Sequence, residues 1–182
     1  DLSVRILDIW AARDEHGGSC NDVAELITTH GPGMQSRWPG QPTDFWSDLP
    51  FARVAGEPDA GFYAMPRLVP HVDQTASAQI AQLYQRLLPA RGRVLDLMAS
   101  HDSHLPSGLD TAEVAGLGLN QAELDENHRL TRRVVHDLNA DPVLPFGDGE
   151  FDAVLNVVSV DYLTDPLAVF SEVGRVLKPG GL

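Results

Sequence analysis

The sequence predicts an α/β fold in which a doubly wound, mostly parallel sheet follows an N-terminal extension of short helices and loops. Two observations after residue 72 predict the sheet. Short apolar stretches alternate with amphipathic ones, and the last apolar stretch, residues 151–158, is mostly apolar after Asp152, as a strand buried on both faces should be. Before residue 72, closely spaced prolines and glycines interrupt long elements. We therefore expect an extension at residues 1–72, which could act as a lid, and the sheet domain at residues 73–182.

Each element of the sheet domain follows from its local pattern. Strands are predicted at residues 93–97, 113–119, 133–137 and 151–158. Amphipathic helices are predicted at residues 74–88 after the N-cap Asp73, at 121–130 after the N-cap Asn120, and at 166–177. The expected inner faces of the first and last helices are Ile80, Leu83, Tyr84, Leu87 and Leu88, and Leu167, Phe170, Val173, Val176 and Leu177. Within the extension, the patterns predict helices at residues 2–13 and 22–29.

Composition narrows the classes of function. The 182 residues contain 13 Lys and Arg against 26 Asp and Glu, a net charge of −13, which would repel a phosphate backbone. No stretch approaches the roughly 20 apolar residues that a membrane-spanning helix needs. A single cysteine, Cys20, cannot form an internal disulfide. We expect a cytoplasmic protein that binds neither nucleic acid nor membrane.

Polar side chains and loops at the strand ends predict a ligand site. In an open parallel sheet, ligands bind beyond the carboxyl ends of the strands, where the strand order reverses. The loop at residues 98–106 follows the first predicted strand, and Asn120 follows the second. Asp137 ends the third, and Ser159 follows the fourth. These ends are expected to surround one pocket.

Three motifs carry a resemblance to a known family. They are Val94-Leu95-Asp96-Leu97, Phe151-Asp152-Ala153-Val154, and the run from Glu172 to Gly181 that ends in Arg175-Val176-Leu177-Lys178-Pro179-Gly180-Gly181. From about Ser77 to Leu182 the chain resembles the class I S-adenosylmethionine-dependent methyltransferases. Within this stretch, the run from Val134 to Leu182 resembles the type-11 branch most closely. The resemblance implies a Rossmann-like fold, S-adenosyl-L-methionine as cofactor, and methyl transfer to a small-molecule acceptor.

The resemblance also implies cofactor-binding residues. Asp96 would lie near the amino-acid end of the cofactor, Asp137 would accept from the adenine amino group, and Asn156 would lie near the methyl-bearing sulfur. The full implied set is Arg67, Asp96, Met98, Ala99, Ser100, His101, Gly118, Asn120, Gln121, Asp137, Leu138 and Asn156. No catalytic base is identified.

Two departures from the family pattern bear on the site. The loop after the first strand is usually glycine-rich, but here it has no glycine before Gly108, so larger side chains narrow the approach to a ligand. At the end of the second strand, Gly118 stands where relatives usually carry the acid that binds the ribose hydroxyls. Asn120 or Gln121 could take over that role.

Alternatives to a methyltransferase remain open. The altered loop is compatible with a non-catalytic ligand-binding or interaction protein on the same fold. A nicotinamide dehydrogenase is less favoured, because no G-x-G-x-x-G motif follows the first strand. His101 and His104 have two residues between them, a spacing that metal ligands can have, but no cysteine or third ligand lies nearby, so they do not predict a metal site.

The fourth predicted strand lacks the charges and prolines that protect an exposed sheet edge. Relatives carry further strands after the Lys178-Pro179-Gly180-Gly181 turn, whereas only Leu182 follows here. We expect the sheet to be truncated after this strand. The strand would then be covered by a continuation of the chain, by the N-terminal extension, or by a second subunit in a homo-oligomer.

Overall fold

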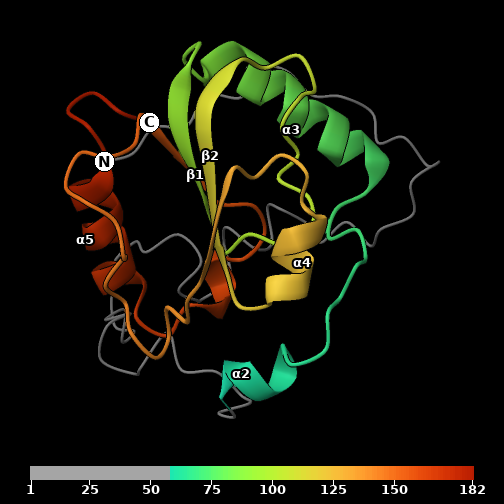
Figure 1. Ribbon diagram of the computed structural model, residues 1–182, viewed down its shortest axis with the longest axis vertical. Coiled ribbons are helices and arrows are strands. Elements are labelled where there is room, and N and C mark those ends of the chain that lie inside the picture. Colours follow the sequence, from blue (N-terminus) through green and yellow to red (C-terminus); the bar gives the residue numbers. More distant parts are fainter. Residues whose placement is uncertain (1–57) are drawn as a thin grey trace, which may run out of the picture. The chain divides into compact units, whose positions relative to one another are not determined.

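The computed structural model describes residues 58–182, so the helices predicted at residues 2–13 and 22–29 lie outside the described part. Four parallel strands form one sheet in the order β3-β2-β1-β4 (Figure 1). Their bounds are β1 Gly92–Leu97, β2 Thr111–Gly118, β3 Arg132–Val135 and β4 Ala153–Leu155. The predicted doubly wound α/β fold is confirmed, and the strand order reverses between β1 and β4.

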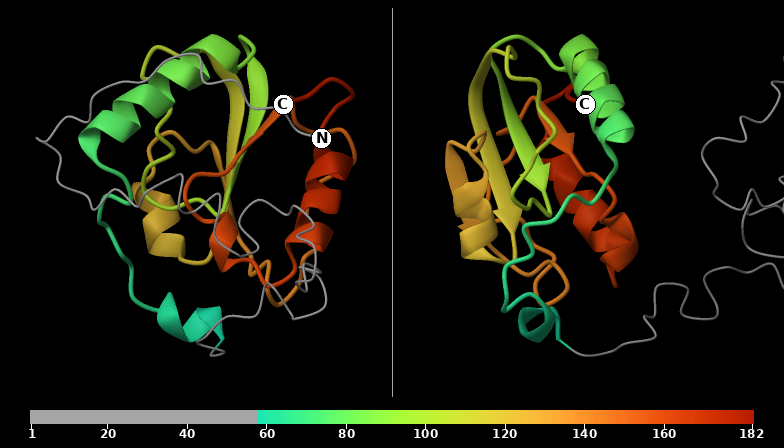
Figure 2. Two further views of the ribbon diagram at one scale, coloured as in Figure 1. Left: turned by 180° about the vertical axis from the view of Figure 1, so that it is seen from behind. Right: turned by 90° about the vertical axis from the view of Figure 1, so that its right-hand side faces the viewer.

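Helices cover both faces of this sheet. α3 (Gln74–Leu87) and α4 (Gln121–Glu126) pack on one face, where Tyr84 and Leu124 join the core around Val94. α5 (Pro166–Val176) packs on the other face through Val169 and Val176 (Figure 1). Two short elements, α2 (Asp59–Phe62) and the 3₁₀ helix η2 (Val160–Tyr162), complete the described chain. Figure 2 shows α2 beyond the end of the sheet toward which the strand arrows point.

The helix caps agree with the sequence, but part of each predicted inner face is wrong. Asp73 caps α3 by accepting from the amide of Ala76. Leu83 and Leu87 of α3 are 41% and 47% exposed, because the buried row is the i, i+4, i+8 set of Ile80, Tyr84 and Leu88. In α5, Leu167 and Phe170 are exposed, and the buried row contains Val169 and Val176. On both helices, the apolar side chains therefore occupy a wider part of the helix circumference than the part that packs on the sheet.

Three predicted elements extend at least two residues beyond the real ones. α4 ends at Glu126 rather than at residue 130, because the Asn127 side chain turns inward and donates to the Ser100 carbonyl and the Ser103 hydroxyl of the loop after β1. β3 ends two residues early at Val135. β4 has three residues, and Phe151 before it pairs separately with Leu177. The apolar run that follows β4 leaves the sheet and borders the cavity described below.

The outer edge of β4 is paired by the end of the described chain. The amide of Leu182 donates to the carbonyl of Asp152 at 3.1 Å, and the Leu182 carbonyl accepts from Val154 at 2.9 Å. The backbone of Leu182 therefore lies on the side of β4 opposite β1. Within residues 58–182, no helix is long and apolar enough to cross a membrane.

Candidate cofactor site

A cavity of about 280 Å³ lies at the carboxyl ends of the strands. Its wall includes Asp96 at the end of β1, Gly118 at the end of β2, Asp137 after β3, and Val157 after β4. This is the place that the strand order predicts, since β1 and β4 are the strands between which the order reverses.

The loop at residues 98–106 after β1 has no glycine, yet its backbone adopts a conformation that glycine favours. Met98 adopts a φ of 60°, in the left-handed region that side chains disfavour. Side chains hold the loop in this shape. Ser103 donates to Asp96 at 2.5 Å, and Asn127 donates to both the Ser100 carbonyl and the Ser103 hydroxyl at 2.9 Å. These buried hydrogen bonds stabilise the strained backbone of the loop.

Asp96 is the most strongly perturbed acid of the site. Its carboxyl is buried, which raises its pKa to about 7, and the negative charge of Asp102 acts in the same direction. The hydrogen bond from Ser103 opposes this change. The group is therefore partly protonated near neutral pH, which is unusual for an aspartate and typical of functional sites.

Gly118 and the helix after it shape the wall next to β2. A Cβ atom on Gly118 would lie only 2.2 Å from the carbonyl oxygen of Ala99, so no side chain fits there. Five residues later, Glu123 of α4 lines the cavity and is 5% exposed. Its carboxylate accepts from the Ser100 hydroxyl and from the Arg67 amide, each at 2.7 Å. The sequence analysis missed Glu123, although the lack of an acid at Gly118 was a signal to search nearby.

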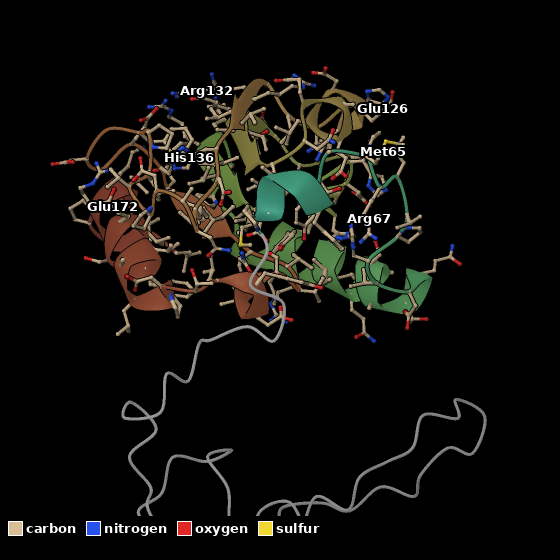
Figure 3. All side chains as sticks on the ribbon, turned by 90° about the horizontal axis from the view of Figure 1, so that it is seen from below. Met65, Arg67, Glu126, Arg132, His136 and Glu172 are labelled. Atoms are coloured by element: carbon tan, nitrogen blue, oxygen red, sulfur yellow. The ribbon has the colours of Figure 1, made fainter. Side chains whose placement is uncertain are left out.

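Residues 58–72, which we call the capping segment, are held by hydrogen bonds to three residues that follow the strands β2 and β3. Arg67 is bound to Glu123 as described, the Tyr63 carbonyl accepts from Asn120 at 2.8 Å, and the Asp59 carboxylate accepts from Asn139 at 2.7 Å. Tyr63 and Arg67 line the cavity. Figure 3 views the molecule from this end, with α2 in front and Met65 and Arg67 on the chain that follows it. The capping segment therefore forms one wall of the site.

The ends of β3 and β4 close the remaining side. Asp137 lines the cavity and uses Oδ1 to accept from the amides of Asn139 and Ala140, which holds the turn after β3. Val158 has a φ of 49°, a strained value for a β-branched residue. The Ser159 hydroxyl beside it is buried without a hydrogen-bond partner among the described residues. Strain and an unpaired polar atom at one place are typical of a functional site.

The structure brings most of the predicted residues to this cavity but not all of them. Those that line it are Arg67, Asp96, Met98, Ala99, Ser100, Gly118, Asp137 and Leu138. Asn120 instead caps α4, Gln121 donates to Asp125 at the surface, and Asn156 donates to the Leu97 carbonyl at 3.3 Å. His101 lines a neighbouring cavity of about 260 Å³.

That second cavity contains several imidazoles but shows neither a metal site nor a catalytic triad. It shares His71, Asp102 and His104 with the first cavity. Both Ser77 Oγ and Asp102 Oδ2 lie 3.1 Å from the same nitrogen, Nδ1 of His104, so the three groups cannot pass a proton in series. Among residues 58–182, no group of His, Cys, Asp and Glu side chains could hold a metal ion.

Comparison with known proteins identifies the family. Residues 91–182 match the model of the type-11 family, described as "Methyltransferase domain". The chain belongs to this family. A 75-residue stretch is 36% identical to the demethylmenaquinone methyltransferase of Staphylococcus saprophyticus, covering 40% of this chain and 32% of that protein. The chain thus spans about a third of the length of this curated relative.

Solved structures with similar folds include two of different activity. One is an S-adenosylmethionine-dependent methyltransferase from Mesorhizobium loti, 21% identical, with a TM-score of 0.45 over 55% of this chain and 49% of that chain. Another is the [4+2]-cyclase SpnF, 24% identical, with a TM-score of 0.47 over 59% of this chain and 43% of that chain. The family assignment rests on the sequence match.

Membership of the family supports S-adenosyl-L-methionine as the cofactor, and the cavity fits it. The cofactor carries positive sulfonium and ammonium groups and one carboxylate. The cavity wall contains the acids Asp96, Asp102, Glu123 and Asp137 and the base Arg67, a complementary excess of negative charge. The cavity volume of about 280 Å³ lies just below the roughly 300–1,000 Å³ that is typical of small-molecule sites.

Proposed function

We propose that this domain transfers a methyl group from S-adenosylmethionine to a small-molecule acceptor in the cytoplasm. The observation that carries the proposal is the acid-rich cavity at the point where the strand order reverses, in a chain that belongs to a methyltransferase family. The net charge of −13 favours a small acceptor over nucleic acid.

The bound cofactor would supply an electrophilic methyl carbon, whose bond to sulfur breaks with both electrons remaining on sulfur while an acceptor lone pair forms the new bond. The residues of this chain bind and orient. Asp96 would face the ammonium group, Arg67 the carboxylate, and Asp137 the adenine amino group, each as a partner of opposite charge or as a hydrogen-bond acceptor. Acceleration would come mainly from proximity and orientation.

Calorimetric titration with S-adenosylmethionine and S-adenosylhomocysteine tests the cofactor, and release of S-adenosylhomocysteine over a panel of acceptors tests transfer. Asp137→Ala should weaken cofactor binding by about 1–3 kcal/mol, because a hydrogen-bonded ligand group loses its acceptor. Asp110→Ala is the matched control, since Asp110 is an exposed acid outside the cavity wall.

Three results separate the alternatives. Binding together with methyl release supports the proposed enzyme. Binding with no release over the panel favours the alternative of a non-catalytic ligand-binding protein on this fold. Absence of binding by the unaltered chain contradicts both the enzyme and a cofactor-binding role for this cavity.

A further inference from the structure

We propose that Glu123 delivers, from helix α4, the carboxylate that accepts hydrogen bonds from the ribose hydroxyls of the bound cofactor. The end of β2 cannot supply that carboxylate in this chain. This inference rests on the proposed function, because it requires a nucleoside-bearing ligand in the cavity.

The first step is steric. The amide of Ala99 donates to the carbonyl of Leu117 at 2.7 Å, which draws the loop after β1 against the end of β2. A Cβ atom on Gly118 would then lie 2.2 Å from the Ala99 carbonyl oxygen and 3.1 Å from Cδ2 of Leu124. Both distances are shorter than normal contacts, and the nearer atom belongs to the backbone. An acid at position 118 is therefore incompatible with this loop.

The second step is the position of the replacement. α4 begins with the N-cap Asn120, directly after β2, and its first turn brings Glu123 back to the cavity wall. Oε2 of Glu123 accepts from Ser100 and Oε1 accepts from the Arg67 amide. A carboxylate has about four acceptor positions on its two oxygens, so each oxygen retains one. Two neighbouring acceptor positions suit the two neighbouring hydroxyls of a ribose.

The third step is charge. The two hydrogen-bond donors to Glu123 are neutral, and no Lys or Arg side chain pairs with it within residues 58–182. The Arg67 guanidinium lies over the ring of Phe62 instead, 4.2 Å from its centroid. A carboxylate that is 5% exposed and lacks a cation is costly unless further donors reach it. Ligand hydroxyls in the cavity would be such donors.

The other acids of the wall occupy different places. Asp96 belongs to β1 and is bound by Ser103, and Asp137 follows β3 and holds its turn. In the sheet, β2 lies between β1 and β3, and Glu123 belongs to α4, the helix that directly follows β2. A ligand whose ends contact Asp96 and Asp137 would therefore place its middle portion, the ribose, beside Glu123.

The test is a cycle of variants and ligands measured by calorimetry. S-adenosylhomocysteine and its 2′,3′-dideoxy analogue are titrated into the unaltered chain, Glu123→Gln and Glu126→Gln. Glu126 is an exposed acid of the same helix and is labelled in Figure 3. Removing the hydroxyls should weaken binding to the unaltered chain and to Glu126→Gln by about 10- to 100-fold. In Glu123→Gln the same removal should cost less than about 3-fold.

The ratio of the two affinities, rather than either affinity alone, decides the result, because a general weakening of the fold affects both ligands equally. Glutamine keeps an acceptor for Ser100 or Arg67, and a thermal melt of each variant verifies folding. An equal hydroxyl penalty in Glu123→Gln and in the unaltered chain overturns the inference alone. An unaltered chain that binds neither compound overturns the proposed function and the inference with it.

Discussion

The two ends of the sheet use acidic side chains in opposite ways. At the amino ends of the strands, acids are paired with bases: Glu150 accepts from both Arg93 and Arg132 at 2.9 and 2.8 Å, and Asp152 pairs with Lys178 at 2.6 Å. At the carboxyl ends, Asp96, Glu123 and Asp137 accept only from hydroxyl and backbone amide groups within the described residues.

The pKa values follow the same division. A backbone hydrogen bond from Arg93 and a side-chain hydrogen bond from Lys178 hold the pKa of Asp152 below its usual value. For Glu150, burial raises the pKa, but hydrogen bonds from Gly147 and Arg132 lower it further than burial raises it. For Asp96, burial prevails and raises the pKa to about 7. Pairing with bases thus favours the ionised carboxylates at the amino ends, whereas burial favours the protonated carboxyl of Asp96 at the carboxyl end, a perturbation that is typical of functional sites.

The largest expected effect comes from Asp96→Asn in the ligand-free protein. Because the folded-state pKa is raised to about 7, the carboxyl stays protonated in the folded chain while it ionises in the unfolded chain above about pH 4. Stability from Asp96 is thus complete below about pH 4 and is lost as the pH rises through 7. The variant should be more stable than the unaltered chain at pH 8 by up to about 4 kcal/mol, with little difference at pH 4.

Urea unfolding at several pH values measures this difference. Asp110→Asn is the control, since it removes the same charge from an exposed position. If the pH dependence of stability is identical in Asp96→Asn and in the unaltered chain, burial does not raise the pKa of Asp96, and the proposed difference between the two ends of the sheet is wrong.

The sheet was predictable because its determinants are local. Apolar runs and N-caps such as Asp73 act within a few residues, and α/β alternation sets the strand directions. The inner faces were less predictable, because Leu167 and Phe170 extend an apolar arc that α5 does not bury. Which part of such an arc is buried depends on the tertiary position of the helix.

The site was predictable in place but not in every residue. Asp96 and Asp137 follow from the strand ends, and both line the cavity. An acid in the first turn of a helix, such as Glu123, normally indicates an exposed residue that favours the helix dipole. It is buried because Ser100 and Arg67, 23 and 56 residues earlier, fold against it. No local pattern encodes contacts at those separations.

The second expected effect is on stability at the ligand end. Gly118→Ala should lower the free energy of unfolding by about 3 kcal/mol, because its new methyl group would overlap the Ala99 carbonyl and displace the loop. Gly174→Ala is the control, since nothing lies within 4 Å of a Cβ there and alanine favours the helix by up to about 1 kcal/mol. Urea unfolding of both variants measures the difference. Equal stability of Gly118→Ala and the unaltered chain would show that the loop has room to move.

A third effect, of about 2 kcal/mol, is expected at the paired end. Arg93→Met removes charge-assisted hydrogen bonds to Glu113 and Glu150 and leaves both acids half-paired. Arg86→Met, at an exposed position of α3, should cost much less. Thermal unfolding measures both variants. Affinity for S-adenosylhomocysteine should be unchanged in Arg93→Met. A loss of affinity without a loss of stability would contradict the view that the amino ends of the strands contribute to stability rather than to ligand binding.

The smallest effect concerns the capping segment. Asn139 donates to Asp59 at 2.7 Å and to the Tyr162 carbonyl at 2.9 Å, and it accepts from the amide and hydroxyl of Thr164. Asn139→Asp keeps the acceptor for Thr164 but replaces the donor to Asp59 with a like charge, whereas Asn139→Ala removes both contacts. Each should cost about 1 kcal/mol in the attachment of the segment.

Hydrogen exchange resolves this small change better than global unfolding does. In both Asn139 variants, the amides of Tyr63 and Arg67 should exchange about five- to tenfold faster, because a loss of about 1 kcal/mol raises the open population by that factor. Amides of β1 should not change, since they open only with the whole sheet. Asn139→Asp is the decisive variant, because its connection to Thr164 persists. Unchanged exchange of residues 58–72 in that variant would mean that Asn120 and Glu123 hold the capping segment on the cavity without Asn139.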